Sequence, residues 1–214
     1  MALPNPAKRR RLIRLFVCCW TLHRFQMYRH FAKRIIDIVA SGLCLIVFSP
    51  IMAIIALLIY LQDFANPIFQ QKRVGFGQGE FTIYKFRSMP INTTELASKD
   101  AGKIQATSFG SFIRRTNLDE LPQLINIFRG DMSLVGPRPS LISQTELIKL
   151  RRQKNVYVCR PGLTGWAQVN GYDDMPEDEK SDFDGEYANG VSFWFDCKII
   201  LRTFVYLTKK PPRY

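Results

Sequence analysis

The chain has 214 residues, 47% of them hydrophobic, and a formal net charge of +12 at pH 7. This length suits one domain with its own core, and the positive charge predicts an anionic partner: nucleic acid, anionic lipid or a phosphorylated substrate. The five cysteines show neither zinc-ligand spacing nor a disulfide framework, which favours a reducing environment. Both histidines, His23 and His30, lie near the N-terminus, so no catalytic imidazole is predicted.

Residues 1–32 form a basic N-terminal arm that contains no acidic residue. Apolar residues lie between its bases, which is compatible with a helix on an anionic membrane surface. A disordered tail is the alternative. No small-residue cleavage site follows the apolar part, so a signal peptide is not predicted.

Residues 33–62 predict a membrane helix. Residues 38–61 carry no charge, and about 24 residues at about 1.5 Å each can cross a bilayer core. Ser49 and Pro50 lie in the middle, where proline removes a hydrogen bond and bends a helix. Basic residues flank the segment on both sides, which favours a re-entrant hairpin that enters and leaves by one membrane face; a plain spanning helix is the alternative.

Residues 67–79 and 81–89 predict two short strands around a glycine-containing turn. Alternation along the second strand places Lys85 and Arg87 on one side and Tyr84 and Phe86 on the other. The polar residues 92–107 predict a loop or a short helix.

The densest reactive chemistry lies in residues 114–139, RRTNLDELPQLINIFRGDMSLVGPRP. Asp119 and Glu120 are adjacent there, with arginines before and after them. Because Pro122 has no amide hydrogen, a helix through it begins only a few residues earlier, and Gly130 is a natural end. Both carboxylates then fall in the first turn, where free N–H groups and the helix dipole favour carboxylates and phosphates.

Thr116 or Asn117 is the predicted N-cap of this helix. Either residue would form a capping box with Asp119 or Glu120, in which the acids merely satisfy backbone donors, and this alternative stays open. Neighbouring helical positions diverge by about 100°, so one carboxylate would cap or bind a metal while the other faces a substrate.

The remaining segments predict a polar helix at residues 140–154 and a loop at residues 160–171, RPGLTGWAQVNG. That loop combines a cation, backbone freedom and an exposed-looking aromatic, which suits phosphate and a ring, although a glycine-rich connection is the alternative. Residues 173–186 hold eight acids and one base and predict a solvated loop. The apolar, aromatic residues 191–208 predict a helix at a membrane interface.

Several motifs together resemble one known family, the bacterial sugar transferases, which are monotopic polyprenyl-phosphate phosphoglycosyl transferases. They occur in the family's order: KRIIDIV with a mid-helix SP, YKFRSM, LDELPQ, GDMSLVGPRP, RPGLTGWAQVNG and DCKIILRT. The resemblance implies transfer of a sugar 1-phosphate from a UDP-sugar to undecaprenyl phosphate with Mg²⁺. The product would start a lipid-linked surface polysaccharide or glycoconjugate.

The resemblance also implies roles for individual residues. The family's catalytic Asp-Glu dyad falls on Asp119 and Glu120, which would also hold the metal, and its membrane kink falls on Ser49 and Pro50. The family's later aspartate is best matched by Asp184, although the neighbouring DFDGEYANG differs from the usual DLYYV. The predicted substrate-binding residues are Arg114, Arg138, Arg160, Lys85, Arg87, Gln168 and Asp184.

The expected fold is α+β and mainly helical: a basic arm (1–32), a re-entrant membrane helix (33–62) and a cytoplasmic catalytic domain with an interfacial C-terminal helix (63–214). The chain resembles a minimal catalytic form, located on the cytoplasmic face of the inner membrane, and a homo-oligomer is compatible with it. Nucleic acid is not an expected partner, because it explains neither the apolar run nor the carboxylate pair. The alternative is a non-catalytic basic membrane protein that binds anionic lipid or a glycan-assembly partner.

Overall fold

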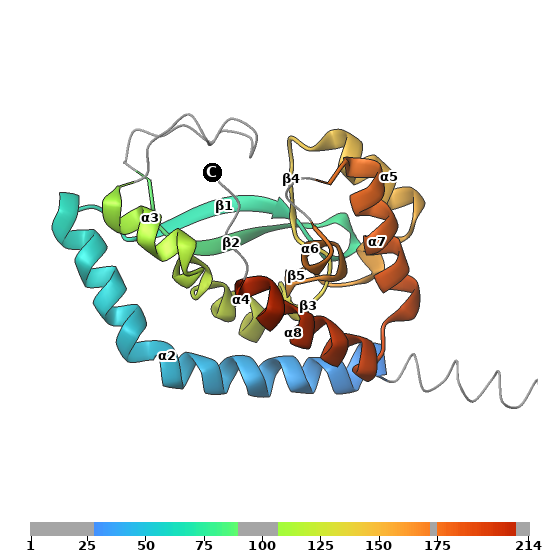
Figure 1. Ribbon diagram of the computed structural model, residues 1–214, viewed down its shortest axis with the longest axis horizontal. Coiled ribbons are helices and arrows are strands. Elements are labelled where there is room, and N and C mark those ends of the chain that lie inside the picture. Colours follow the sequence, from blue (N-terminus) through green and yellow to red (C-terminus); the bar gives the residue numbers. More distant parts are fainter. Residues whose placement is uncertain (1–27, 90–106, 172–174, 209–214) are drawn as a thin grey trace, which may run out of the picture.

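The computed structural model describes residues 28–89, 107–171 and 175–208 (Figure 1). These residues form an α+β fold with a three-stranded sheet, β2-β1-β4, and a two-stranded sheet, β3-β5. The predicted basic arm lies outside the described residues except for a short π-helix, η1 (Tyr28–Ala32). Nearly all of the predicted loop at 92–107 is also outside them.

One long apolar helix, α2 (Lys33–Asp63), dominates the N-terminal half. It is the only helix among the described residues that is long and apolar enough to cross a membrane, with a mean hydropathy of 2.8 over its most apolar window, of which 11% is buried. A core helix of a soluble protein would be mostly buried. Pro50 lies inside α2, the Ser49 hydroxyl donates to the Ile46 carbonyl at 2.8 Å, and Figure 1 shows the helix bent partway along its length. Membrane insertion and the role of Ser49 and Pro50 in it stay predictions.

The predicted hairpin is present, with shorter strands. β1 (Ile68–Val74) pairs antiparallel with β2 (Glu80–Phe86), so that Ile68 faces Phe86 across the ladder. The turn contains a short 3₁₀ helix, η2 (Phe76–Gln78), and Gly77 adopts φ of 62°, a left-handed conformation that glycine reaches without strain. β4 (Ser140–Leu141) extends the sheet beside β1.

The segment that carries the carboxylate pair differs from the prediction of one continuous helix. Two short elements replace it, the 3₁₀ helix η4 (Leu118–Glu120) and α4 (Gln123–Arg129), and a separate helix, α3 (Ser108–Arg115), precedes them. Asn117 takes a left-handed φ of 55° and caps nothing with its side chain, while the Thr116 hydroxyl donates back to Phe112 at 2.9 Å. The capping box is therefore wrong. The predicted end at Gly130, with φ of 104°, is confirmed.

The C-terminal half packs short elements around the parallel pair β3 (Ser133–Val135) and β5 (Gly162–Thr164). Its helices are α5 (Thr145–Gln153), a 3₁₀ helix η5 (Val156–Val158), α6 (Trp166–Val169), α7 (Glu177–Gly190) and α8 (Phe193–Thr208). The solvated acidic loop is a wrong prediction from residue 177 onward, because that stretch is α7 and it buries Asp184. Trp166 is likewise buried, not exposed.

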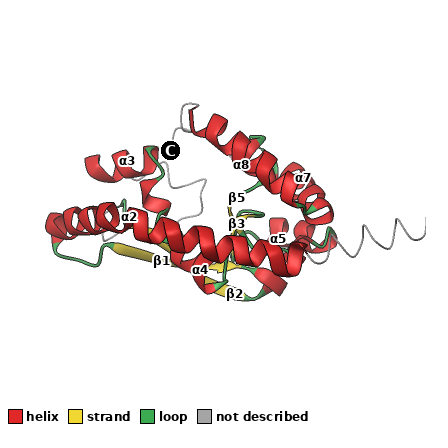
Figure 2. Ribbon diagram, turned by 90° about the horizontal axis from the view of Figure 1, so that it is seen from below, coloured by secondary structure: helices red, strands yellow, loops and turns green. Residues whose placement is uncertain are grey.

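The described residues form three hydrophobic core clusters, and β2 contributes to two of them. Ile83 packs with Leu124, Ile127 and Met132 of the α4 region. Phe86 packs with Ile55, Ile59 and Ile113, which belong to α2 and α3. Since consecutive strand residues point to opposite faces, β2 is covered on both sides. Figure 2 shows the hairpin and α8 on opposite sides of α2.

Candidate active site

Asp119 and Glu120 occupy η4, which packs against β2. Glu120 Oε1 accepts a hydrogen bond from Lys85 Nζ at 2.7 Å and another from Arg138 Nη2 at 2.9 Å. Lys85 lies on β2, and Arg138 lies in the Val135-Gly136-Pro137-Arg138-Pro139 turn after β3. Residues from three parts of the chain therefore converge on one carboxylate.

Asp119 is 8% exposed and lies where the charges of Lys85, Arg114 and Arg138 all act on it. Burial raises the pKa of its carboxyl to about 6, and the neighbouring Glu120 charge adds to the effect, although the three cations oppose it. Asp119 is therefore a carboxylate that loses its proton only near neutral pH.

Glu120 has the opposite protonation behaviour. Burial by itself raises the pKa of this carboxyl, but the charges and hydrogen bonds of Arg138 and Lys85 outweigh burial and bring the pKa below its ordinary value. Two adjacent carboxylates with pKa values pushed apart can serve different chemical roles. Glu120 is a fixed anion that orients two cations, whereas Asp119 is available for a reaction.

A buried ion pair between Arg151 and Asp184 supports the backbone at Arg138. Arg151 donates to Asp184 Oδ2 from Nε at 2.8 Å and from Nη2 at 2.6 Å, and the exposed fractions of the two side chains are 2% and 1%. Arg151 Nη1 donates to the Arg138 carbonyl at 2.9 Å. Asp184 thus supports the backbone that presents Arg138, and its predicted contact with substrate stays a prediction.

Sequence reasoning missed Arg151. One signal for it exists, since Arg151 follows the fully buried Leu147 by four residues on α5, which puts both on the same helix face. The adjacent Arg152 points the other way and donates to Gln78 Oε1 at the surface.

Three other predicted substrate-binding residues have partners elsewhere. Arg87 forms an ion pair with Asp63, the last residue of α2. Arg160 Nε donates to the Gly130 carbonyl at 2.9 Å, and the Gln168 amide donates to the Leu163 carbonyl. The structure brings five of the predicted site residues together: Asp119, Glu120, Lys85, Arg114 and Arg138. Substrate-binding roles for Arg87, Arg160 and Gln168 stay predictions.

The carboxylates of the site suit a Mg²⁺ ion that also binds the substrate. Among the described residues no group of three or more His, Cys, Asp or Glu side chains is placed to hold a metal ion, which argues against an all-protein cage. Mg²⁺ more commonly uses one or two carboxylates and completes its shell with water and substrate phosphates. Asp119 and Glu120 fit that second arrangement.

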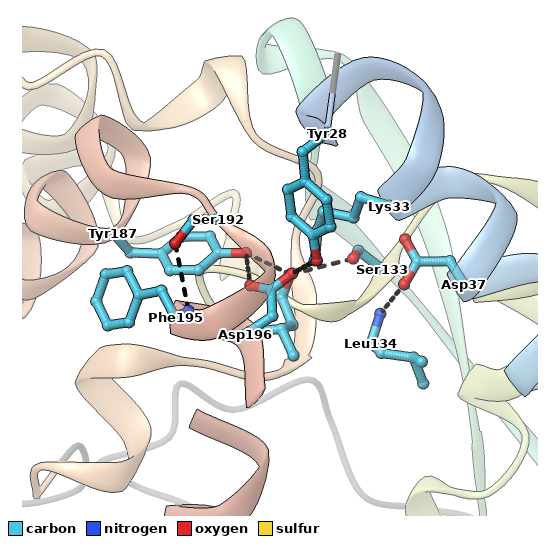
Figure 3. A network of polar contacts seen from close by, with 10 residues as sticks. Tyr28, Lys33, Asp37, Ser133, Leu134, Tyr187, Ser192, Phe195 and Asp196 are labelled. Carbon is cyan, nitrogen blue, oxygen red and sulfur yellow. Dashed lines mark hydrogen bonds and ion pairs between the residues drawn. The ribbon is translucent and has the colours of Figure 1, made fainter. Parts of the chain in front are cut away.

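A network around Asp196 fixes α2 against the rest of the fold (Figure 3). Asp196 Oδ2 accepts from Lys33 Nζ at 2.6 Å and from the Tyr28 hydroxyl at 2.7 Å, and Asp196 Oδ1 lies 2.8 Å from the Tyr187 hydroxyl. Asp196 is in the first turn of α8, so one buried carboxylate joins the start of α2 to α7 and α8. Asp37 on α2 also accepts the Leu134 amide at 3.0 Å.

The fold and the site define an α+β domain with one long apolar helix and a cation-walled carboxylate pair, a class suited to handling phosphorylated molecules. The chain belongs to the bacterial sugar transferase family, whose pattern matches residues 28–210.

Several proteins similar to this chain are themselves described as sugar or sugar-phosphate transferases. The chain is 40% identical over 182 residues to the UDP-glucose:undecaprenyl-phosphate glucose-1-phosphate transferase of Escherichia coli, covering 80% of this chain and 39% of that protein. It is also 40% identical to an Aeromonas hydrophila UDP-N-acetylgalactosamine-undecaprenyl-phosphate N-acetylgalactosaminephosphotransferase, covering 81% and 43%. The chain thus spans about two fifths of each. The uncharacterized sugar transferase EpsL of Bacillus subtilis is 35% identical, covering 80% and 84%.

Proposed function

We propose that this chain transfers a sugar 1-phosphate from a UDP-sugar to undecaprenyl phosphate. The observation that carries the proposal is the carboxylate pair with divergent pKa values, surrounded by Lys85, Arg114 and Arg138. Bringing two phosphorylated substrates together needs cations to offset their charge. The names of the Escherichia coli and Aeromonas hydrophila relatives state this type of reaction for those proteins.

In the first step, an Asp119 carboxylate oxygen attacks the phosphorus that bears the sugar. A new bond forms between that oxygen and the phosphorus, the bond to the bridging oxygen breaks, and UMP leaves with the electron pair. The sugar phosphate is then bound to Asp119 as an acyl phosphate. Arg138 and Lys85, which Glu120 holds in place, would stabilise the negative charge on the phosphoryl oxygens.

In the second step, a phosphate oxygen of undecaprenyl phosphate attacks the same phosphorus. The bond to Asp119 breaks, the carboxylate is regenerated, and the product is a polyprenyl diphosphosugar. Asp119 and Glu120 would hold Mg²⁺, which when bound offsets the charge of the donor diphosphate. Every covalent step is made by residues of this chain and the two substrates.

The proposal places the chain at the cytoplasmic face of the inner membrane, with α2 as a re-entrant hairpin. The apolar length and exposure of α2 support a membrane location. Single cysteines introduced just before and just after α2, in a variant without the native cysteines, should react with a membrane-impermeant thiol reagent from the same side. Labelling from opposite sides would instead show a spanning helix.

Donor-only trapping tests the covalent route. Incubating the purified chain with a radiolabelled UDP-sugar and no lipid should release at most one UMP per protein and leave a sugar phosphate on the peptide that contains Asp119. A screen of UDP-sugars by UMP release identifies the sugar first. An active preparation that releases UMP only when both substrates are present, and never carries the adduct, would refute the aspartyl intermediate.

The activity should depend on pH through Asp119. Only the ionised carboxylate is a nucleophile, and burial raises its pKa to about 6, so kcat/KM should rise with pH and level off above a midpoint near that value. Glu120, whose pKa is lowered, should stay ionised throughout this pH range and cause no second change in kcat/KM. A pH profile of UMP release checks this, and a flat profile between pH 5 and pH 8 would contradict it.

A further inference from the structure

A cation-lined cavity of about 110 Å³, apart from the Asp119–Glu120 site, lies at the start of α2. Four basic residues line it, Arg29, Lys33, Arg34 and Arg160, and Asp37 is the one carboxylate among its described lining residues. None of the cations around the Asp119–Glu120 pair lines this cavity. Figure 3 shows Lys33 and Asp37 on the first turns of α2. The cavity is thus a separate basic site where the apolar helix begins.

The end of α4 brings two of the guanidinium groups together. Arg34 donates to the Ile127 carbonyl at 2.6 Å and to the Phe128 carbonyl at 2.8 Å, while Arg160 donates to the Gly130 carbonyl. A Cβ on Gly130 would lie 3.0 Å from Arg34 Nη2, so glycine leaves room for this approach. Carbonyl groups orient the guanidiniums but are neutral, so both positive charges persist.

The third guanidinium has a donor without an acceptor. Arg29 Nη2 donates to the Val158 carbonyl at 2.6 Å, but Arg29 Nε is buried and has no hydrogen-bond partner within the described part of the chain. A buried donor without a partner costs free energy, and a bound anion would satisfy it. Lys33 pairs with Asp196 at 2.6 Å, whereas Asp37, which accepts the neutral Leu134 amide, keeps its negative charge and partly offsets that of Arg34 (Figure 3). Arg29, Arg34 and Arg160 still outnumber that one carboxylate.

We propose that this cavity binds the headgroup phosphate of an anionic membrane lipid. Its volume equals that of about three to four water molecules, which is room for a phosphate group. Guanidinium forks match phosphate oxygens well. The cavity opens beside the first turns of α2, the depth at which headgroups would lie if that helix enters a bilayer, and the exposed Phe76 and Val158 give its rim apolar surface. This site does not depend on the proposed reaction.

Native mass spectrometry of the full chain, released from nanodiscs of equal parts phosphatidylglycerol and phosphatidylcholine, tests the proposal. Wild type should retain one phosphatidylglycerol in preference to phosphatidylcholine. Arg29→Gln should lower that retention about tenfold, since one charge-assisted hydrogen bond is lost. Val158→Glu, which places a carboxylate at the rim, should lower it as well.

Two matched variants are the controls. Arg152→Gln removes the same charge from the surface of α5, and Val158→Gln adds a polar group without a charge; both should retain the lipid like wild type. If Arg29→Gln fails to fold by circular dichroism, the Val158 pair decides. Equal retention in all variants would overturn the proposal. Displacement of the lipid by inorganic phosphate or UDP would assign the cavity to a soluble phosphate and overturn the lipid assignment.

Discussion

Asp119→Asn is expected to eliminate UMP release from any UDP-sugar while making the fold more stable. The amide is nearly isosteric but cannot attack phosphorus, so the rate should fall by about 10⁴-fold or more. The donor-only adduct should disappear as well. Asp182→Asn, which removes a carboxylate from an exposed ion pair with Lys154, is the matched control and should keep full activity.

The stability effect follows from the sign of the Asp119 shift. Burial raises its pKa from 3.8 to about 6, so the folded state binds this proton more tightly than the unfolded chain does. Stability from that proton is complete below the unfolded pKa and is lost as pH rises through the folded one. Above pH 7 the ionised carboxylate is a cost that Asn removes, worth up to about 3 kcal/mol, or roughly 6–12 °C in Tm.

The pH dependence of this stability difference provides an internal control. At pH 4.5 wild-type Asp119 is largely protonated in the folded state, but the unfolded chain already ionises above its pKa of 3.8, so the Tm difference between Asp119→Asn and wild type should be clearly smaller than at pH 7 without vanishing. It should grow as the pH rises to 7. A variant that is less stable than wild type at pH 7.5, or a difference that does not change with pH, would show that Asp119 is not a strained buried acid.

Asp184→Asn should cause the largest loss of stability among single polar substitutions in this domain. It leaves the Arg151 charge buried with a weaker acceptor, a situation that typically costs about 3–5 kcal/mol. Thermal or denaturant unfolding in detergent measures the loss.

The double variant Arg151→Met/Asp184→Leu separates stability from positioning. Removing both charges should restore most of the stability, because apolar groups of similar size can replace a buried pair. It also removes the donor to the Arg138 carbonyl, so kcat should stay about 10²-fold below wild type from misplacement of Arg138. Recovery of stability and kcat together would show that Arg151 does not position Arg138.

Local pattern alone predicted several elements correctly. The hairpin, the long apolar helix and the C-terminal helix follow from strand alternation, an uninterrupted apolar run and aromatic spacing, all of which are properties of short stretches of chain. Charge and the family resemblance predict Lys85, Arg114 and Arg138 as substrate-binding residues, but their convergence on the carboxylate pair was not predicted. The division of the segment around Asp119 and Glu120 into η4 and α4 was not predicted, because the left-handed conformation of Asn117 has no clear sequence signal.

The remaining errors concern burial. Residues 177–186 are so acidic that a solvated loop was expected, yet Arg151 neutralises Asp184 and Trp166 donates to Glu186, so the stretch forms a helix against the core. Neither partner is near α7 in the sequence.

The amino-acid sequence by itself determined the family, the apolar helix and the identity of the acidic pair, because each is encoded in contiguous residues. Only the tertiary structure decided which acid has a lowered pKa and which a raised one, since that depends on burial of Asp119 and on Lys85 and Arg138 reaching Glu120 from distant segments. It also decided that Arg160 lies with Arg29 and Arg34 in a separate basic cavity. Electrostatic interactions act through space, and their strength depends on burial, which a linear pattern does not specify.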